Sequence, residues 1–379
     1  MRSVPTMAVN RAVPDAEQLM RLRAEVRTFL AGSDYVPGCD SWMRGFDPGF
    51  SRGVAGHGWI GMTWPREYGG SEASNVERLV VLEELLRAGA PLGAHLTGDR
   101  QIGPAILRFG SEELKGELLP GICRGESVFC LGLSEPEAGS DLAAVRTRAE
   151  RVDGGWAITG SKIWTTAAHR ATHMYVLART DASGTRHEGL SEFIVDMGAP
   201  GIEVRPIEDL TGGHHFNEVF FDDVFVPDSR VLGTIGDGWA QVMAQLAFER
   251  GGPERFLSMH LLLTTMLGVL RRHPDRSSTE LAGELAARLV GLRRLALDVA
   301  RALDRGEAPG PAASELKLLG SEFESDVVEA ARYVLEVGDA DAEERRVLEE
   351  ATGAVPASSI RGGSSQIMRT VVSRMEAGR

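Results

Sequence analysis

The sequence predicts an α+β protein with a helical first part, a β-rich middle part and a helical last part. Apolar residues recur at helical spacing before about residue 125 and again after about residue 233. Between them, short segments are rich in β-branched and aromatic residues, with no long helical pattern among them. We therefore expect an N-terminal α-helical domain at residues 1–125, a middle β-barrel or sheet domain at 126–233, and a C-terminal four-helix bundle at 234–379.

The first helix is expected to begin at Asp15, whose carboxylate is suited to an N-cap. The apolar residues that follow it at three- and four-residue steps are Leu19, Leu22, Val26 and Leu30. Further helices are expected over residues 76–88, 98–109 and 112–119, the last of them ending at Pro120-Gly121.

In the middle part, Asp153-Gly154-Gly155 predicts a tight turn that joins strands 147–152 and 156–159 as a hairpin. Further strands are expected over residues 174–177, 192–195, 202–206 and 218–226. In the last part, helices are expected over residues 239–270, 281–303, 312–337 and 367–375, with joints rich in Gly, Pro, Asp and Arg.

Composition excludes several classes of protein. Of the 379 residues, 43% are hydrophobic and 25% are charged, as in ordinary globular proteins. The net charge of −13 argues against a nucleic-acid binder, which needs a basic surface. No apolar run approaches the roughly 20 residues of a membrane span, and the first residues do not resemble a signal peptide. Three cysteines at scattered positions favour a reducing, cytoplasmic location, and no metal site is predicted.

Two runs contain residues suited to binding a ligand. Residues 131–141 read L-G-L-S-E-P-E-A-G-S-D, in which small residues allow close approach of the backbone and two serines offer hydroxyl groups. Residues 160–166 read G-S-K-I-W-T-T, at the end of an expected strand. Taken alone, the first run is more often a plain turn, and the tryptophan of the second could be core packing or a wall for a planar ring.

Taken together, these runs resemble the acyl-CoA dehydrogenase family. The order S-E-P-x-A-G-S-D, G-S-K-x-W-T-T and A-R-T-D (178–181) is similar to the family's FAD-binding middle domain. Residues 64–70 (W-P-R-E-Y-G-G), 216–227 (F-N-E-V-F-F-D-D-V-F-V-P) and 364–369 (S-S-Q-I-M-R) match other family motifs. The resemblance implies an acyl-CoA dehydrogenase-like fold and an FAD-dependent enzyme of fatty acid metabolism that desaturates an acyl thioester between its α and β carbons.

The resemblance also implies residue roles. Leu131, Leu133 and Ser134 would lie along the flavin pyrimidine, Trp164 would flank the isoalloxazine, and Thr166 would approach N5. Gly139 and Ser140 would lie near the cofactor, with Ser140 at the pyrophosphate or the thioester entrance. The full set expected to bind FAD is Leu131, Leu133, Ser134, Gly139, Ser140, Trp164, Thr165, Thr166, Ser364 and Gln366.

The reaction needs a carboxylate that removes the α proton. Many family members carry it in the C-terminal loop, where this chain has Gly362. Isovaleryl-CoA dehydrogenases carry it instead in a helix, within an L-x-x-E-R sequence that Glu249 matches here. Glu249 is therefore the expected base, the alternative being a simple ion pair with a neighbouring arginine. The N–H of Gly362 would still donate to the thioester carbonyl.

Two arginines are expected near the substrate. Arg250 follows the base and would orient the loop or the CoA phosphates, or form a structural ion pair. Arg361 stands where relatives usually have an aromatic residue, so it would bind a polar or acidic acyl group, a CoA phosphate, or a carboxylate of its own protein.

The chain departs from homotetrameric relatives at residues 271–277 and 336–341, where those relatives contact a neighbouring subunit's FAD. A homo-oligomer and a heterotetramer with a second acyl-CoA dehydrogenase chain therefore both stay open. An electron-transfer flavoprotein or similar acceptor would reoxidise the flavin. The alternatives are a non-catalytic or half-site subunit, and a dehydrogenase or oxidase that acts on a carrier-protein thioester.

Overall fold

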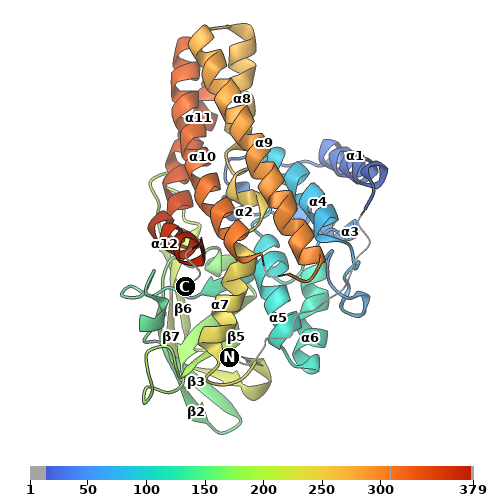
Figure 1. Cartoon of the computed structure of the whole chain (residues 1–379). Helices are drawn as coiled ribbons and strands as arrows, with labels where there is room; N and C mark the ends of the chain where they lie inside the picture. Colours follow the sequence, from blue (N-terminus) through green and yellow to red (C-terminus); the bar gives the residue numbers. More distant parts are fainter. Residues whose placement is uncertain (1–13, 308, 377–379) are drawn as a thin grey trace. The chain divides into compact units, whose positions relative to one another are not determined.

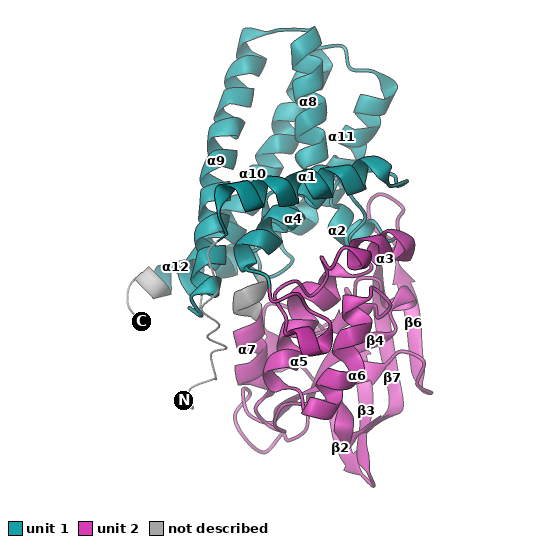
Figure 2. Cartoon of the chain, turned by 90° about the vertical axis from the view of Figure 1, so that its right-hand side faces the viewer, with its two compact units in different colours: residues 1–46, 73–92, 247–379 teal, residues 47–72, 93–246 magenta. Residues whose placement is uncertain are grey.

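The computed structural model describes residues 14–307 and 309–376, without the side chains of residues 246–249, 375 and 376. The chain divides into two compact units, coloured separately in Figure 2. Unit 1 comprises residues 1–46, 73–92 and 247–379, and unit 2 comprises residues 47–72 and 93–246. The three domains expected at residues 1–125, 126–233 and 234–379 follow different boundaries and stay a prediction.

Unit 1 consists of helices. They are α1 (Ala16–Gly32), α2 (Ser41–Arg44), α4 (Asn75–Arg87), α8 (His260–Arg272), α9 (Arg276–Asp304), α10 (Gly310–Val337), α11 (Ala342–Ala354) and α12 (Ser365–Glu376), with the short helices η6 (Pro253–Arg255) and η7 (Val355–Ser359). Asp15 is the N-cap of α1, as predicted, and accepts a hydrogen bond from the N–H of Gln18. Capping boxes also begin α4 at Ser74 and α11 at Asp341.

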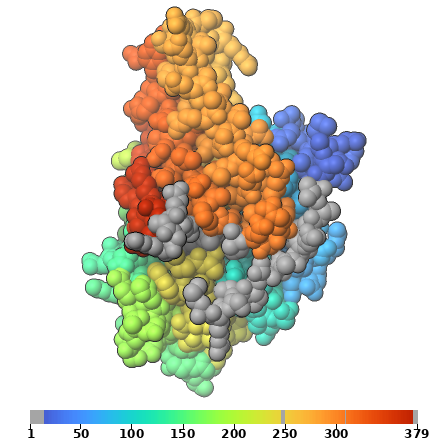
Figure 3. All heavy atoms as spheres, viewed as in Figure 1, coloured from blue at the N-terminus to red at the C-terminus, as the bar shows by residue number. Residues whose placement is uncertain are grey.

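The long helix α9 contacts α10 and buries one stripe of its surface. Five of its buried apolar residues, Ala282, Leu285, Leu292, Ala296 and Val299, are spaced by three, four or seven residues, and Ala300 is buried beside the last of them. Such spacing places them on one face of a helix. The opposite face is open to solvent, and Figure 3 shows it as a continuous orange surface.

Two helix predictions in the last part of the chain are wrong. The stretch over residues 239–270 is not one helix, because α7 (Gly238–Glu249) ends before Gly251-Gly252-Pro253 and α8 begins only at His260. Two glycines and a proline disfavour a continuous helix at this point. The second error is the omission of α11, which lies between the helices expected at residues 312–337 and 367–375.

Unit 2 combines a sheet with helices that lie before, between and after the strands in the sequence. Its helices are α3 (Pro48–Gly56), η1 (Arg66–Tyr68), the π-helix η2 (Gly98–Ile102), α5 (Gly103–Phe109), α6 (Glu112–Cys123), η3 (Leu142–Ala144), η4 (Ala168–Arg170), η5 (Asp228–Arg230) and α7 up to residue 246. The expected end of a helix at Pro120 is wrong. Pro120 lies in the last turn of α6, where the missing N–H costs the helix only one hydrogen bond.

The sheet contains eight strands among the described residues. They are β1 (Phe129–Gly132), β2 (Arg148–Val152), β3 (Gly155–Lys162), β4 (His173–Arg179), β5 (Leu190–Asp196), β6 (Ile202–Ile207), β7 (Phe216–Pro227) and β8 (Val231–Leu232). Their order is β6–β7–β3–β2–β4–β5–β8, and β1 pairs with β4 in parallel. The predicted hairpin at Asp153-Gly154-Gly155 joins β2 to β3, and Gly154 has a φ of 73°.

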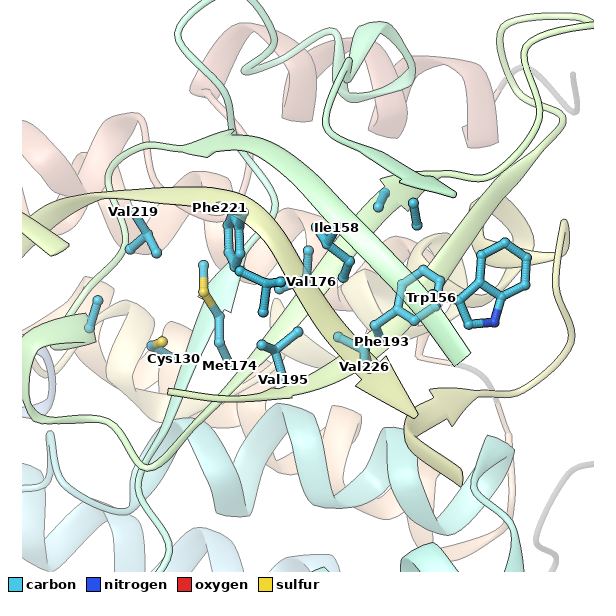
Figure 4. Packing of buried hydrophobic residues seen from close by; sticks show 14 residues of the cluster. Cys130, Trp156, Ile158, Met174, Val176, Phe193, Val195, Val219, Phe221 and Val226 are labelled. Atoms are coloured by element: carbon cyan, nitrogen blue, oxygen red, sulfur yellow. The ribbon is translucent and has the colours of Figure 1, made fainter. Parts of the chain in front are cut away.

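The core of unit 2 is the buried side of this sheet, shown in Figure 4. Trp156 on β3 lies 5.8 Å from Phe193 on β5, measured between ring centroids. Val176, Phe221 and Val226 belong to the same buried cluster. Alternate residues of β7 are buried, as expected for a strand with one face toward the core. The predicted order of helical, β and helical parts is therefore confirmed.

All three cysteines are buried. Cys39 lies in unit 1, and Cys123 and Cys130 lie in unit 2. Burial, the largest cause in each case, raises the pKa of the Cys39 and Cys123 thiols to about 12 and also raises that of Cys130. Among the described helices, none is long and apolar enough to span a membrane.

Candidate functional site

A buried ion pair joins the two runs of unit 2 that are predicted to bind a ligand, residues 131–141 and 160–166. Lys162, the last residue of β3, is fully buried, and its Nζ lies 2.8 Å from Oε1 of Glu135 in the first run. The same ammonium donates to the carbonyl of Leu133 at 3.2 Å. In addition, the N–H of Ile163 donates to the carbonyl of Ser134 at 2.9 Å. These contacts fix the run after β1 against the run after β3.

The Glu135 carboxylate also receives hydrogen bonds from two backbone N–H groups. These belong to Arg146, at 2.6 Å, and Thr147, at 2.9 Å. Burial opposes ionisation of Glu135, but the charge of Lys162 and these donors outweigh it and lower the pKa of Glu135. Burial lowers the pKa of Lys162 to about 8, against the opposing charge of Glu135. The Glu135 carboxylate therefore holds together its own loop, the segment of Arg146 and Thr147, and the end of β3 at Lys162.

An irregularity in β3 lies at the start of the second run. The pairing of β3 with β7 shifts in register between Ile158 and Gly160. A side chain could not fit at Gly160, because an added Cβ would lie 2.6 Å from Oγ1 of Thr147. That hydroxyl in turn donates to the carbonyl of Ser161 at 3.1 Å. β-Bulges change the direction of a strand in this way.

Trp164 follows in a conformation that is unfavourable for an aromatic residue. Its φ is +59°, in the left-handed region that favours glycine. Its side chain is 57% exposed and contacts Phe216 edge-to-face, with 5.8 Å between ring centroids. Strain of this kind is found where function requires a particular geometry. The loop therefore holds a large aromatic ring on the surface of unit 2.

The residue after it, Thr165, is held rigidly by β7. Its N–H donates to the carbonyl of Asn217 at 2.9 Å, and Nδ2 of Asn217 donates to the carbonyl of Thr165 at 3.0 Å. Thr165 is fully buried, yet its Oγ1 has no hydrogen-bond partner among the described residues. A buried hydroxyl without a partner destabilises the fold, so packing alone does not account for this group.

A pocket of about 480 Å³ lies next to Ser140. It is lined by Asp141, Arg146, Arg179 and Arg186, together with Ala143, Ala144, Val145, Ala182, Gly184 and Thr185. Arg186 forms an ion pair with Asp141. Arg179 donates to the carbonyl of Ala143 at 2.9 Å and so holds the loop in place. Three guanidinium groups make the pocket suitable for an anion.

In unit 1, Arg361 forms an ion pair within its own protein. Its two terminal nitrogens lie 2.5 and 2.7 Å from the carboxylate oxygens of Asp40. The guanidinium also lies 4.7 Å from the ring centroid of Trp42. This is the third of the three arrangements expected for Arg361. Gly362 follows with a φ of +67°, so the ion pair anchors one end of a left-handed turn.

The buried carboxyl group of Glu324 interacts electrostatically with both members of this ion pair. Glu324 is fully buried and accepts a hydrogen bond from the N–H of Ser258 at 2.9 Å. The hydroxyl of Ser258 in turn accepts from Nε1 of Trp42 at 2.8 Å. Burial raises the pKa of Glu324 to about 8, and Asp40 adds to the shift, whereas Arg361 opposes it.

We expect this carboxyl to make the stability of the protein depend on pH. An ordinary glutamate has a pKa of 4.5, so between pH 4.5 and about 8 the folded chain keeps a proton that the unfolded chain releases. The free energy of unfolding should then be greatest below pH 4.5 and fall as the pH rises through 8. In the unchanged protein, the free energy of unfolding should decrease by about a few kcal/mol between pH 5 and 8.5, as measured by urea unfolding. In Glu324→Gln this decrease should be absent.

The exposed Glu329 on the same helix provides the control, because Glu329→Gln should keep the pH dependence of the original chain. An unchanged pH dependence in Glu324→Gln would show that another group titrates.

The structure brings several predicted site residues together within each unit. In unit 2, the contacts of Lys162 and Ile163 join the run of Leu131, Leu133 and Ser134 to that of Trp164, Thr165 and Thr166. Gly139 and Ser140 lie exposed on the turn beyond Glu135.

In unit 1, Gly362 and Ser364 lie on the segment that leads into α12, and Gln366 lies in the first turn of that helix. Ser364 accepts a hydrogen bond from the N–H of Ile367 at 3.3 Å. A methyl group built on Gly363 would lie 3.8 Å from Nη2 of the buried Arg250, so that side chain approaches the turn. Glu249 is the last residue of α7, and its side chain lies outside the described part of the structure.

Sequence reasoning missed three functional candidates in unit 2. Lys162 and Glu135 stand inside the motifs, but we assigned them no role. Asn217, also inside a motif, is fully buried and fixes the loop of Trp164. A charged or amide residue within an otherwise small and apolar motif was the available signal, because such groups are rarely buried without a partner.

Comparison with known proteins identifies three consecutive family models. Residues 16–126 match the acyl-CoA dehydrogenase N-terminal domain, residues 130–224 the middle domain, and residues 236–376 the C-terminal domain. The chain is 37% identical over 328 residues to acyl-CoA dehydrogenase FadE34 of Mycobacterium tuberculosis, a match that covers 86% of this chain but only 45% of that protein.

A second relative matches over nearly its whole length. Acyl-CoA dehydrogenase IpdE1 of Mycobacterium tuberculosis is 32% identical over 391 residues, covering 96% of this chain and 98% of that protein. Among solved structures, the Tcur3481-Tcur3483 steroid ACAD is 28% identical with a TM-score of 0.86, covering 97% of this chain and 99% of that chain. The chain therefore belongs to the acyl-CoA dehydrogenase family, which consists of flavin oxidoreductases that act on CH–CH groups.

Proposed function

We propose that this protein binds FAD and desaturates an acyl-CoA between its α and β carbons. The observation that carries the proposal is the loop of Trp164 in unit 2. A strained and exposed aromatic ring stands there beside a buried hydroxyl that no described residue satisfies. A flavin, which has a flat ring edged with hydrogen-bonding atoms, fits both features.

In this proposal, Ser134 and Thr166 donate hydrogen bonds to the ring system, Trp164 flanks it, and Thr165 contributes its hydroxyl. Leu131 and Leu133 supply apolar contact, and Gly139, Ser140, Ser364 and Gln366 contact the remainder of the cofactor. Bound FAD would supply the acceptor for the hydride that leaves the β carbon.

Glu249 is the proposed base that takes the proton from the α carbon. The N–H of Gly362 would donate a hydrogen bond to the thioester carbonyl and stabilise the negative charge that develops there. Arg250, which approaches the Gly362-Gly363 turn, would help to keep that turn in place. Because Arg361 is bound to Asp40 at both terminal nitrogens, we assign it to the support of the turn and not to an acidic acyl group.

The pocket beside Ser140 is the proposed site for a CoA phosphate. Arg146 is exposed there, and Arg186 is held by a single carboxylate, Asp141, so both could turn toward an anion. Arg179 is engaged with backbone carbonyls and would keep the loop in place.

A half-site role in a heteromer is the second candidate. The Tcur3481-Tcur3483 steroid ACAD carries the names of two chains, and this chain is 28% identical to it. Residues 271–277 and 336–341 also lack the family pattern for contacting a neighbouring subunit's FAD. A second acyl-CoA dehydrogenase chain is therefore a proposed partner, as is an electron-transfer flavoprotein.

The test is the visible absorption of the purified chain reconstituted with FAD and mixed anaerobically with a panel of acyl-CoAs. We expect bleaching of the flavin band by at least one of them. Stable FAD binding without bleaching by any acyl-CoA or carrier-bound acyl group would contradict the proposed activity. Failure to bind FAD alone, reversed by a partner chain, would favour the heteromer.

A further inference from the structure

The π-helix η2 carries a buried amide that no described residue satisfies. Gln101 is only 3% exposed, and neither Oε1 nor Nε2 has a hydrogen-bond partner among the described residues. Its neighbour Asp99, also buried, accepts a hydrogen bond from the N–H of Gly61 at 2.7 Å. The deficit therefore belongs to Gln101 itself and is not shared by every polar group of the turn.

Such a group is costly to keep. A glutamine side chain offers two donor hydrogens and one acceptor oxygen, and burying both ends without partners destabilises the folded state. A leucine of similar size would avoid that cost. A π-helix is itself less stable than an α-helix and is frequent at functional sites. At a functional site, a residue that reduces stability can be retained for the sake of activity.

The position of η2 links the amide to the proposed site. Within unit 2, η2 contacts β1, and a Cβ added at Gly98 would lie 3.7 Å from the ring of Phe129. The strand β1 continues directly into Leu131, Leu133 and Ser134. Gln101 is therefore carried by an element that packs against the strand leading to the proposed flavin and substrate residues.

We propose that Gln101 is a specificity-determining residue that binds an uncharged oxygen function, a carbonyl or a hydroxyl, on the acyl part of the substrate. Its Nε2 would donate to a carbonyl oxygen, and its Oε1 would accept from a hydroxyl. A neutral amide can pair with an uncharged oxygen function through either end without adding a charge to the site. This inference rests on the proposed function.

The first experiment measures stability without substrate. Gln101→Leu should raise the Tm of the FAD-bound protein by about a few degrees, because it removes an unsatisfied amide. The matched control is Gln241→Leu in the same unit. Gln241 is also buried, but its Nε2 donates to Glu192 at 2.8 Å and to the carbonyl of Leu232 at 3.0 Å, so its loss should lower the Tm. A Tm lowered equally by both substitutions would overturn the inference.

The second experiment compares substrates that differ by one oxygen. Hexanoyl-, octanoyl- and decanoyl-CoA are each compared with the analogue that carries a carbonyl at the carbon next to the chain end. The original chain should reduce its flavin about 10- to 100-fold more efficiently with at least one oxo analogue than with the parent, and Gln101→Leu should abolish that preference while still using the parent.

Equal preference in the original chain and in Gln101→Leu, or no preference in either, would contradict the inference while leaving the proposed function intact. If the flavin is bleached by none of these acyl-CoAs or by any other of the panel, the proposed function fails, and the inference fails with it.

Discussion

Glu249→Gln is expected to lower the rate of flavin reduction by acyl-CoA about 10²- to 10⁴-fold, the range over which a positioned general base contributes. Glutamine keeps the size of the side chain but cannot take the α proton at neutral pH. FAD binding should be retained, because Glu249 is not among the residues proposed to contact the cofactor. Rapid mixing under anaerobic conditions, followed at the flavin band, measures the rate.

Glu329→Gln, exposed on α10, is the control and should reduce its flavin at the original rate. If Glu249→Gln keeps that rate, the base lies elsewhere, and the alternative interpretation of Glu249 as a partner of a neighbouring arginine gains support. A second test transfers the carboxylate: Gly362→Glu combined with Glu249→Gln should recover part of the activity. The recovery should be incomplete, since the φ of +67° at this position disfavours a residue with a side chain.

Asp40→Ala is expected to lower the free energy of unfolding by about 3–5 kcal/mol, because it leaves the buried guanidinium of Arg361 without its counterion. Both partners are buried: the side chain of Asp40 is 2% exposed and that of Arg361 is 14% exposed. Urea unfolding of the two chains at pH 7 gives the difference. Flavin reduction should also slow, because the turn at Gly362 loses its anchor.

The double substitution Asp40→Ala and Arg361→Met separates charge from packing. Removal of both charges should restore much of the stability, since a buried ion pair often stabilises no more than apolar residues of similar volume. The exposed pair of Arg305 and Glu307 serves as the control, and Glu307→Ala should change stability little. An equal loss in the single and the double variants would mean that Asp40 acts through packing and not through charge.

Local signals made much of the fold predictable. The carboxylate of Asp15 beside a helical apolar pattern identified the start of α1, and Asp153-Gly154-Gly155 identified the hairpin of β2 and β3. Both signals act within a few residues of the chain. The order of motifs in turn identified the family, and the prediction that Trp164 and Ser134 share one site depends on that resemblance.

The remaining features depend on partners that are distant in sequence. Asp40 is separated from Arg361 by 321 positions, and Glu135 from Lys162 by 27. No sequence periodicity predicts such pairs, because a buried ion pair is fixed by the tertiary fold and not by local preference. The π-helix at residues 98–102 was likewise predicted only as part of an ordinary helix, since its hydrogen-bond pattern has no composition of its own.

Because the three cysteines are buried, their thiols can be used to measure local unfolding of the protein. Only thiolates react with alkylating or disulfide reagents, and these thiols are both shielded and held protonated at neutral pH. The rate at which a thiol is modified therefore measures how often the structure around that cysteine opens. Because Cys39 belongs to unit 1 and Cys123 and Cys130 to unit 2, mass spectrometry of the labelled peptides would give a separate opening rate for each unit without an introduced probe.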